Sequence, residues 1–171
     1  MEDELLPWAL DAFDLGTDVI EIGPGYGVVS DLLGARVGSL TCVELDGALA
    51  RSLSRRTAGT NVKVIRADAV RLPFPDKSFS AALCFTVLHH IPGPLQQDRL
   101  LAEVARVLRP GGTFAGTDSF SGFLFRMIHT GDNLTLIEPR MFSQRLQSAG
   151  FTGIAVDQRA CVFRFRGRRS G

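Results

Sequence analysis

The amino-acid sequence predicts an α/β protein whose β-sheet is mostly parallel and is connected by crossover helices. Short apolar and β-branched runs alternate along the chain with stretches whose apolar residues recur at helical spacing. The 18 glycines and eight prolines among 171 residues fit the many tight connections of such a fold. The last two strand-like runs are separated by little more than residues 157–160, which is too short for a parallel crossover. These two runs are therefore expected to form an antiparallel hairpin.

Apolar runs with β-branched residues mark the strands. The first run ends at a glycine-rich turn, and the last continues into the arginine-rich segment 164–169, which alternates like an edge strand with solvated charges. A basic stripe that binds nucleic acid is the alternative interpretation of this segment. Strands are expected at residues 18–22, 39–43, 62–65, 79–85, 113–117, 154–156 and 161–165.

Amphipathic stretches mark the helices, and several carry end signals. Asp46 is a suitable N-cap, Pro94 and Pro139 suit a first turn, and Gly150 suits the left-handed position after a last turn. The Pro-Gly-Gly segment at 110–112 is expected to end the longest helix. Helices are expected near residues 6–13, over 26–34, after Asp46, over 94–109 and over 139–149.

The length and net charge of the chain indicate how many domains it has and which functional classes are disfavoured. The chain has the size of one domain, expected to span residues 1–171. Its 19 basic and 18 acidic residues leave a net charge of +1, which disfavours a nucleic-acid binder that neutralises phosphates. No apolar run is long enough to cross a bilayer, and the acidic first four residues differ from a secretory signal. The chain is therefore predicted to be cytoplasmic, with no membrane span.

The three cysteines, Cys42, Cys84 and Cys161, lie far apart in strand-like runs. A metal site would need paired Cys or His residues at short spacing, and the sequence has none. We expect three buried free thiols and no metal.

A glycine-rich turn, EIGPGYG at residues 21–27, directly follows the first expected strand. Glycines at alternate positions let the backbone turn sharply and approach a ligand closely. Ligands of open parallel sheets bind at this carboxyl-end edge. A structural role of the glycines alone is the alternative interpretation.

Acidic residues end the next two strands. Glu44 ends the second strand, where a carboxylate can accept hydrogen bonds from both ribose hydroxyls, and Asp68 follows the third, where it can accept from an adenine amino group. A solvated surface acid is the alternative for either residue alone. Together with the turn, the two acids predict a site for an adenosine-containing cofactor.

NAD and S-adenosylmethionine both contain adenosine, and the turn favours the second. Its glycines are spaced G-x-G-x-G, unlike the G-x-G-x-x-G of dinucleotide sites. Glu21 within the turn would repel a pyrophosphate but attract a sulfonium and an ammonium group. The charge therefore predicts S-adenosylmethionine.

With these motifs the chain resembles the class I S-adenosylmethionine-dependent methyltransferases, of the small-molecule type labelled methyltransferase type 11. Segment 21–27 resembles the first motif of that family, Glu44 its ribose-binding acid, and the pair Asp68-Ala69 its adenine contact. Segments 71–79, 88–91 and 106–112 resemble the family's stretches around the fourth strand and before the fifth.

The resemblance runs in order from about residue 18 to 118 and more loosely to Phe151. It implies a Rossmann-like, doubly wound, mostly parallel sheet of seven strands with the last strand antiparallel. It also implies methyl transfer from S-adenosylmethionine. The cofactor-binding residues that it implies are Glu21, Gly23, Pro24, Gly25, Gly27, Glu44, Leu45, Asp68 and Ala69.

His89 and His90 directly follow the fourth expected strand, beside the position expected for the methyl group. A neutral imidazole can accept a proton near pH 7, so both are candidate catalytic residues. Lining the cofactor pocket or bonding to backbone is the alternative role for them. His129, in the segment 119–137, is a further candidate.

The segment 119–137 fits neither strand nor helix spacing and is predicted to be a lid or substrate loop. Its apolar residues predict a small, partly apolar acceptor, and ordinary core packing is the alternative. Many members of the family cover the cofactor with longer N-terminal helices, whereas only 17 residues precede the first expected strand here. The cofactor is therefore expected to be covered by segment 119–137 or by a homodimer partner, or to be left uncovered. Nucleic-acid amino methylases of this fold often carry an Asn/Asp-Pro-Pro-aromatic run after the fourth strand. Segment 84–88, CFTVL, lacks this run, which disfavours an adenine amino group or a glutamine as the acceptor.

Two other functions stay open on the sequence. A non-catalytic module that binds S-adenosylmethionine would fit the short N-terminal segment. An NAD-linked oxidoreductase would also use adenosine recognition at three strand ends.

Overall fold

The central strands are apolar on both faces, as a parallel sheet covered by helices on both sides requires. In β1 (Asp18–Ile22), Val19 and Ile20 point to opposite faces, and both are fully buried. The computed structural model describes residues 15–120 and 135–171. The helix expected near residues 6–13, His129 and most of the segment 119–137 lie outside the described residues.

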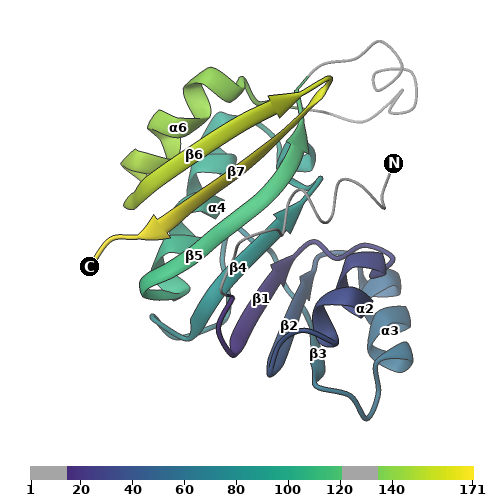
Figure 1. Cartoon of the computed structure of the whole chain (residues 1–171). Helices are drawn as coiled ribbons and strands as arrows, with labels where there is room; N and C mark the ends of the chain where they lie inside the picture. The colour runs from purple at the N-terminus through teal and green to yellow at the C-terminus, as the bar shows by residue number, and fades with distance from the viewer. Residues whose placement is uncertain (1–14, 121–134) are drawn as a thin grey trace.

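The described strands form one seven-stranded sheet (Figure 1). Its order is β3-β2-β1-β4-β5-β7-β6, and neighbours from β3 to β5 are parallel. β7 is antiparallel to both β5 and β6. The expected α/β class, the seven strands and the antiparallel last strand are confirmed. Besides β1 the strands are β2 (Ser39–Glu44), β3 (Val62–Arg66), β4 (Phe79–Phe85), β5 (Leu108–Ser119), β6 (Phe151–Arg159) and β7 (Val162–Arg169).

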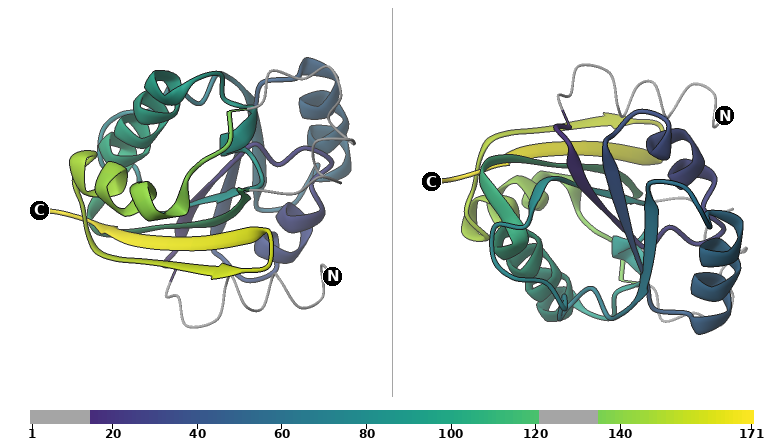
Figure 2. Two further views of the ribbon diagram at one scale, coloured as in Figure 1. Left: turned by 90° about the horizontal axis from the view of Figure 1, so that it is seen from above. Right: turned by 90° about the horizontal axis from the view of Figure 1, so that it is seen from below.

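Helices cover the two faces in separate groups. α2 (Val28–Gly34) and α3 (Gly47–Arg56) pack through Leu33 and Leu53 onto the face that carries Val19. α4 (Pro94–Val107) and α6 (Pro139–Ser148) pack onto the face that carries Ile20, and Figure 2 shows them together on that side. The larger apolar core lies under this second pair.

The helix ends follow the expected signals. Asp46 caps α3, because its side chain accepts from the backbone N–H groups of Ala48 and Leu49. Gly150 has φ 92° after the end of α6. Both predictions are confirmed.

The prediction for the fifth strand was too short at its start. β5 begins at Leu108, directly after α4, and therefore includes the Pro-Gly-Gly segment that was expected only to end a helix. The strand tolerates this segment because its pairing with β4 is irregular: Leu108 pairs with Phe79, whereas Thr113 pairs with Ala81.

Two expectations for the C-terminal hairpin were wrong. The arginine-rich strand β7 is not an edge strand, because it lies between β5 and β6 and buries Phe163 and Phe165. Cys161 is exposed at the hairpin turn, whereas Cys42 and Cys84 are buried as expected. None of the helices in the two described ranges is both long and apolar enough to cross a membrane.

Candidate functional site

The glycine-rich turn joins β1 to α2 in a conformation that other residues rarely adopt. Gly23, Gly25 and Gly27 all have left-handed backbone, with φ of 64°, 56° and 77°. At Gly23 an added Cβ would lie 2.5 Å from a methyl carbon of Val87, which follows β4. Glycine is therefore required at this point both by the backbone angle and by the neighbouring chain.

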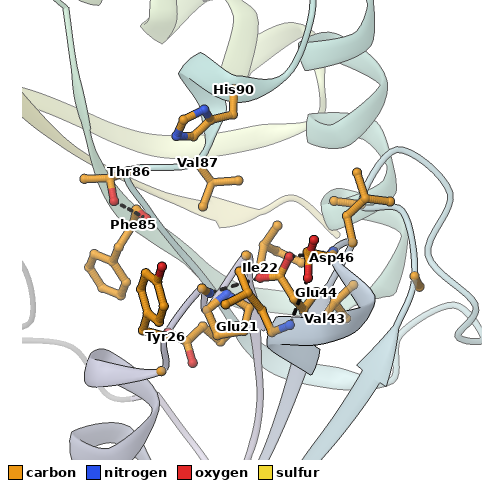
Figure 3. Close-up of a pocket in the computed structure, with 18 of the residues that line it drawn as sticks. Glu21, Ile22, Tyr26, Val43, Glu44, Asp46, Phe85, Thr86, Val87 and His90 are labelled. Carbon is orange, nitrogen blue, oxygen red and sulfur yellow. Dashed lines mark hydrogen bonds between the residues drawn. The ribbon is translucent and has the colours of Figure 1, made fainter. Parts of the chain in front are cut away.

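A cavity of about 760 Å³ opens at the carboxyl ends of β1, β2 and β4 and beside the segment that follows β3 (Figure 3). This is the edge at which open α/β sheets bind ligands. All nine residues predicted to bind the cofactor line the cavity: Glu21, Gly23, Pro24, Gly25, Gly27, Glu44, Leu45, Asp68 and Ala69. The structure thus brings together residues from three separate parts of the chain.

Glu44 connects the two turns that border the cavity. It is buried, and its Oε2 accepts from the backbone N–H of Gly25 at 3.0 Å while its Oε1 accepts from that of Asp46 at 2.9 Å. Each carboxylate oxygen can accept more than one hydrogen bond, so Glu44 keeps capacity for a ligand's hydroxyl groups.

Glu21 is a buried acid on the cavity wall. Its Oε2 accepts from Ser30 Oγ at 2.6 Å and from Cys42 Sγ at 3.4 Å. Burial is the main cause that raises the pKa of Glu21 above its ordinary value, and the two donors partly oppose the rise. Within the part of the chain that the structure describes, no lysine or arginine pairs with this carboxyl group.

Ser30 and Cys42 were not found as site residues from the sequence. Cys42 is directly opposite Glu21 in the pairing of β1 with β2, and the register of two strands is not visible in the sequence. Burial, followed by the nearby Glu21 carboxyl group, raises the pKa of the Cys42 thiol, so this thiol stays protonated and donates to Glu21.

Asp68 is the exposed member of the three predicted acids. Its Oδ1 accepts from the backbone N–H of Val70 at 3.0 Å, which holds the turn after β3. It lines the cavity together with Ala69. The other oxygen, Oδ2, has no protein donor in the residues described.

The two candidate histidines occupy different places in η1 (Leu88–His90), a short 3₁₀ helix. His90 is exposed and lines the cavity. His89 is buried and does not line it; its Nδ1 lies 2.5 Å from Oδ1 of Asp118, a fully buried residue at the end of β5. The structure therefore brings His90, and not His89, to the site. Asp118 was not found from the sequence, because it lies 29 positions from His89.

Further contacts fix η1 against α4. Gln97 on α4 donates from Nε2 to the carbonyl oxygens of Leu88 and Thr135, at 2.9 and 2.8 Å. The backbone N–H of Thr135 donates to the carbonyl oxygen of His89 at 3.0 Å. The short helix that carries His90 is thus held by α4 and by the segment before α6, as well as by Asp118 of β5.

The chain matches the family model of the methyltransferase domain over residues 20–116, which is more than half of its length. It belongs to this methyltransferase family. The matched residues contain the glycine-rich turn, Glu44, Asp68 and both histidines of η1. The family makes S-adenosylmethionine the cofactor of the domain.

Curated relatives match over more than half of the chain. The chain is 38% identical over 106 residues to a fatty-acid O-methyltransferase of Mycolicibacterium smegmatis, which covers 61% of this chain and 38% of that protein. It is 36% identical over 105 residues to phthiotriol/phenolphthiotriol dimycocerosates methyltransferase 1 of Mycobacterium ulcerans, again covering 60% and 38%. The chain therefore spans well under half the length of these relatives.

Solved structures share the fold at lower identity. A methyltransferase of Haloferax volcanii, solved with the methyltransferase activator Trm112, has a TM-score of 0.81 at 16% identity and covers 97% of this chain and 89% of its own. A SAM-dependent methyltransferase of Methanosarcina mazei has a TM-score of 0.75 at 18% identity, with 94% and 95% covered. The [4+2]-cyclase SpnF has a TM-score of 0.76 at 16% identity, with 98% and 80% covered, so the fold alone does not define the reaction.

Proposed function

We propose that this chain transfers the methyl group of S-adenosylmethionine to a small, partly apolar acceptor. The observation that carries the proposal is the buried carboxyl group of Glu21, which lines a ligand-sized cavity without a cationic partner among the described residues. A buried acid of this kind is stabilised by a positively charged ligand. S-adenosylmethionine carries both a sulfonium and an ammonium group.

The residues of the cavity fit the rest of the cofactor. Glu44 would accept from the ribose hydroxyls, because each of its oxygens is engaged by only one backbone N–H group. Asp68 would accept from the adenine amino group through Oδ2. Gly23 and Gly25 would let the ligand approach the backbone closely.

When bound, the cofactor supplies a methyl group on a positively charged sulfur. The acceptor's nucleophile would form the new bond to the methyl carbon, and the pair of electrons of the breaking C–S bond would stay on sulfur. A proton lost by the acceptor would go to His90, the histidine on the cavity wall. His89 would act as a positioning residue, since its bond to Asp118 ties η1 to β5.

Apolar side chains favour a partly apolar acceptor. Tyr26, Phe85, Val87 and Ile91 also line the cavity. In Figure 3, Tyr26 and Phe85 stand on the opposite side of the view from Glu44. The names of the two curated relatives, with their fatty-acid and phthiotriol acceptors, favour the same chemical class for this chain.

A ligand comparison tests the proposal. We expect S-adenosylmethionine and S-adenosylhomocysteine to raise the melting temperature of the protein and NAD to leave it unchanged. Transfer of a labelled methyl group is then measured with a panel of short-chain alcohols, phenols, amines and carboxylic acids. Stabilisation by NAD alone would point to an oxidoreductase, and binding of the cofactor with no transfer to any acceptor would point to a non-catalytic binding module.

A further inference from the structure

Thr86 has a backbone conformation that threonine rarely adopts. It directly follows β4 with φ 56°, in the left-handed region, where a β-branched residue is an outlier. Its N–H donates to the carbonyl oxygen of Thr117 at 2.8 Å, so β5 holds the strained residue in place. A glycine would relieve this strain. Strained residues of this kind are concentrated at functional sites, so the Thr86 side chain is a candidate for a functional role.

In its bonded orientation the Thr86 hydroxyl offers its oxygen to a ligand as an acceptor. Thr86 is exposed and lines the cavity. Its Oγ1–H donates to the carbonyl oxygen of Phe85 at 2.7 Å, as Figure 3 shows. The hydroxyl has one hydrogen and two lone pairs, so its hydrogen is used and its lone pairs remain available for an incoming O–H or N–H group.

Thr86 lies on the acceptor side of the cavity. Figure 3 places Thr86, like Phe85, on the opposite side of the view from Glu44 and Asp46, where the ribose would bind. It is four residues before His90, on the segment that leads into η1. Thr86 therefore lies away from the proposed ribose contact and next to the segment that carries His90, the proposed proton acceptor.

We propose that Thr86 determines acceptor specificity, because its hydroxyl accepts a hydrogen bond from an O–H or N–H group of the acceptor. This inference rests on the proposed methyl transfer. A hydrogen bond to the Thr86 hydroxyl would select alcohols, phenols or amines over carboxylates. Carboxylates are ionised at neutral pH and carry no hydrogen to donate. The acceptor class would then differ from the fatty acids that the name of one relative gives.

Two ligands of equal chain length test this selection. We would measure the binding of octan-1-ol and of octanoate to the protein loaded with S-adenosylhomocysteine, by ligand-observed NMR at pH 7.5 (about three pH units above the pKa of an ordinary carboxyl group). The wild type should bind the alcohol more tightly. Thr86→Val should weaken alcohol binding about 3- to 10-fold, the range for one neutral hydrogen bond, and reduce the preference. Thr86→Ser should retain it.

Lys77 provides a matched control for backbone strain. It also has left-handed backbone, with φ 57°, but it is outside the cavity. Lys77→Gly and Thr86→Gly relieve the same kind of strain, so we expect similar changes in melting temperature. Only Thr86→Gly should alter the ratio of the two affinities. A merely structural role for Thr86 would leave that ratio unchanged.

Each other outcome also decides the question. An unchanged preference in Thr86→Val, or a wild type that binds S-adenosylhomocysteine but favours octanoate or binds neither ligand, would overturn the inference and leave the proposed function standing. Failure of the wild type to bind S-adenosylhomocysteine would overturn the proposed function itself.

Discussion

The two ends of the cavity are built on different principles. At the cofactor end, Glu21, Glu44 and Asp68 each follow from a local rule, because each stands in or just after a strand and reaches the same edge of the sheet. At the proposed acceptor end, the short helix that carries His90 is fixed by partners far along the chain, such as Asp118 and Thr135, which both bond to its buried neighbour His89. On the proposed function, cofactor binding would depend on charge at strand ends, whereas acceptor chemistry would depend on long-range pairing.

The largest effect is expected from the acceptor end. His90→Ala should lower the rate of methyl transfer about 10²- to 10⁴-fold, the usual contribution of a general base. Cofactor affinity should change little, because His90 lies on the acceptor side. Single-turnover kinetics and calorimetry with S-adenosylmethionine measure the two quantities. Equal losses in both would assign His90 to cofactor binding and remove the distinction between the ends.

A substitution at Gly23 tests the contact between the glycine-rich turn and the segment that follows β4. Gly23→Ala should lower the free energy of unfolding by more than the about 1–2 kcal/mol of a left-handed alanine, because its Cβ would also clash with Val87. Gly25→Ala is the matched control, since Gly25 has φ 56° and no atom within 4 Å of an added Cβ. Chemical denaturation compares the two variants. Equal destabilisation would contradict the close contact between the turn and the segment after β4.

The pair that holds η1 should matter for stability more than for cofactor binding. Asp118→Ala removes an acceptor from the side chain and the backbone N–H of His89 and from the backbone N–H of Ser119. We expect a loss of about 1–3 kcal/mol in the free energy of unfolding, the cost of buried groups left without a partner. Asp118→Asn keeps one acceptor oxygen and should lose less. A wild-type melting temperature for Asp118→Ala would contradict this role.

The smallest effect is a pH dependence at the cofactor end. Burial raises the pKa of Glu21 in the folded protein above its ordinary value of 4.5. The protonated side chain therefore contributes stability that is fully present below pH 4.5. This contribution is lost as the pH rises through the raised pKa. Glu21→Gln carries no such charge. The free energy of unfolding of this variant, relative to wild type, should therefore be higher at pH 8 than at pH 4.5. A difference that does not change with pH would show that burial does not perturb Glu21.

Local rules explain most of the fold that the sequence predicted. The cap at Asp46, the left-handed Gly150 and the apolar central strands depend on residues close in sequence, and all three agree with the structure. The position of β7 inside the sheet does not follow from such rules. Its alternating arginines are typical of a strand with one solvated face, which is equally compatible with the edge of the sheet or its interior.

The site residues also fall into two groups, those that residues close in sequence predict and those that depend on distant partners. The nine predicted cofactor residues all line one cavity, because the carboxyl ends of the neighbouring parallel strands β1, β2 and β3 meet at the same edge of the sheet. The two histidines could not be separated in the sequence, since a change of one residue in a short helix turns a side chain from the cavity to the core. In the structure, His89 is buried against Asp118 of β5, whereas His90 lines the cavity.

Calorimetric titration of S-adenosylmethionine into wild type and Glu44→Ala tests whether the acids at the strand ends bind the cofactor, because this carboxylate is the proposed ribose contact. Asp157→Ala, which removes an exposed acid paired with Arg164 on the β6–β7 hairpin, is the matched control. The account predicts binding to wild type and to the control, with binding to Glu44→Ala weaker by about 1.5–3 kcal/mol, the range for hydrogen bonds to a charged group. Equal affinity in all three proteins would contradict it.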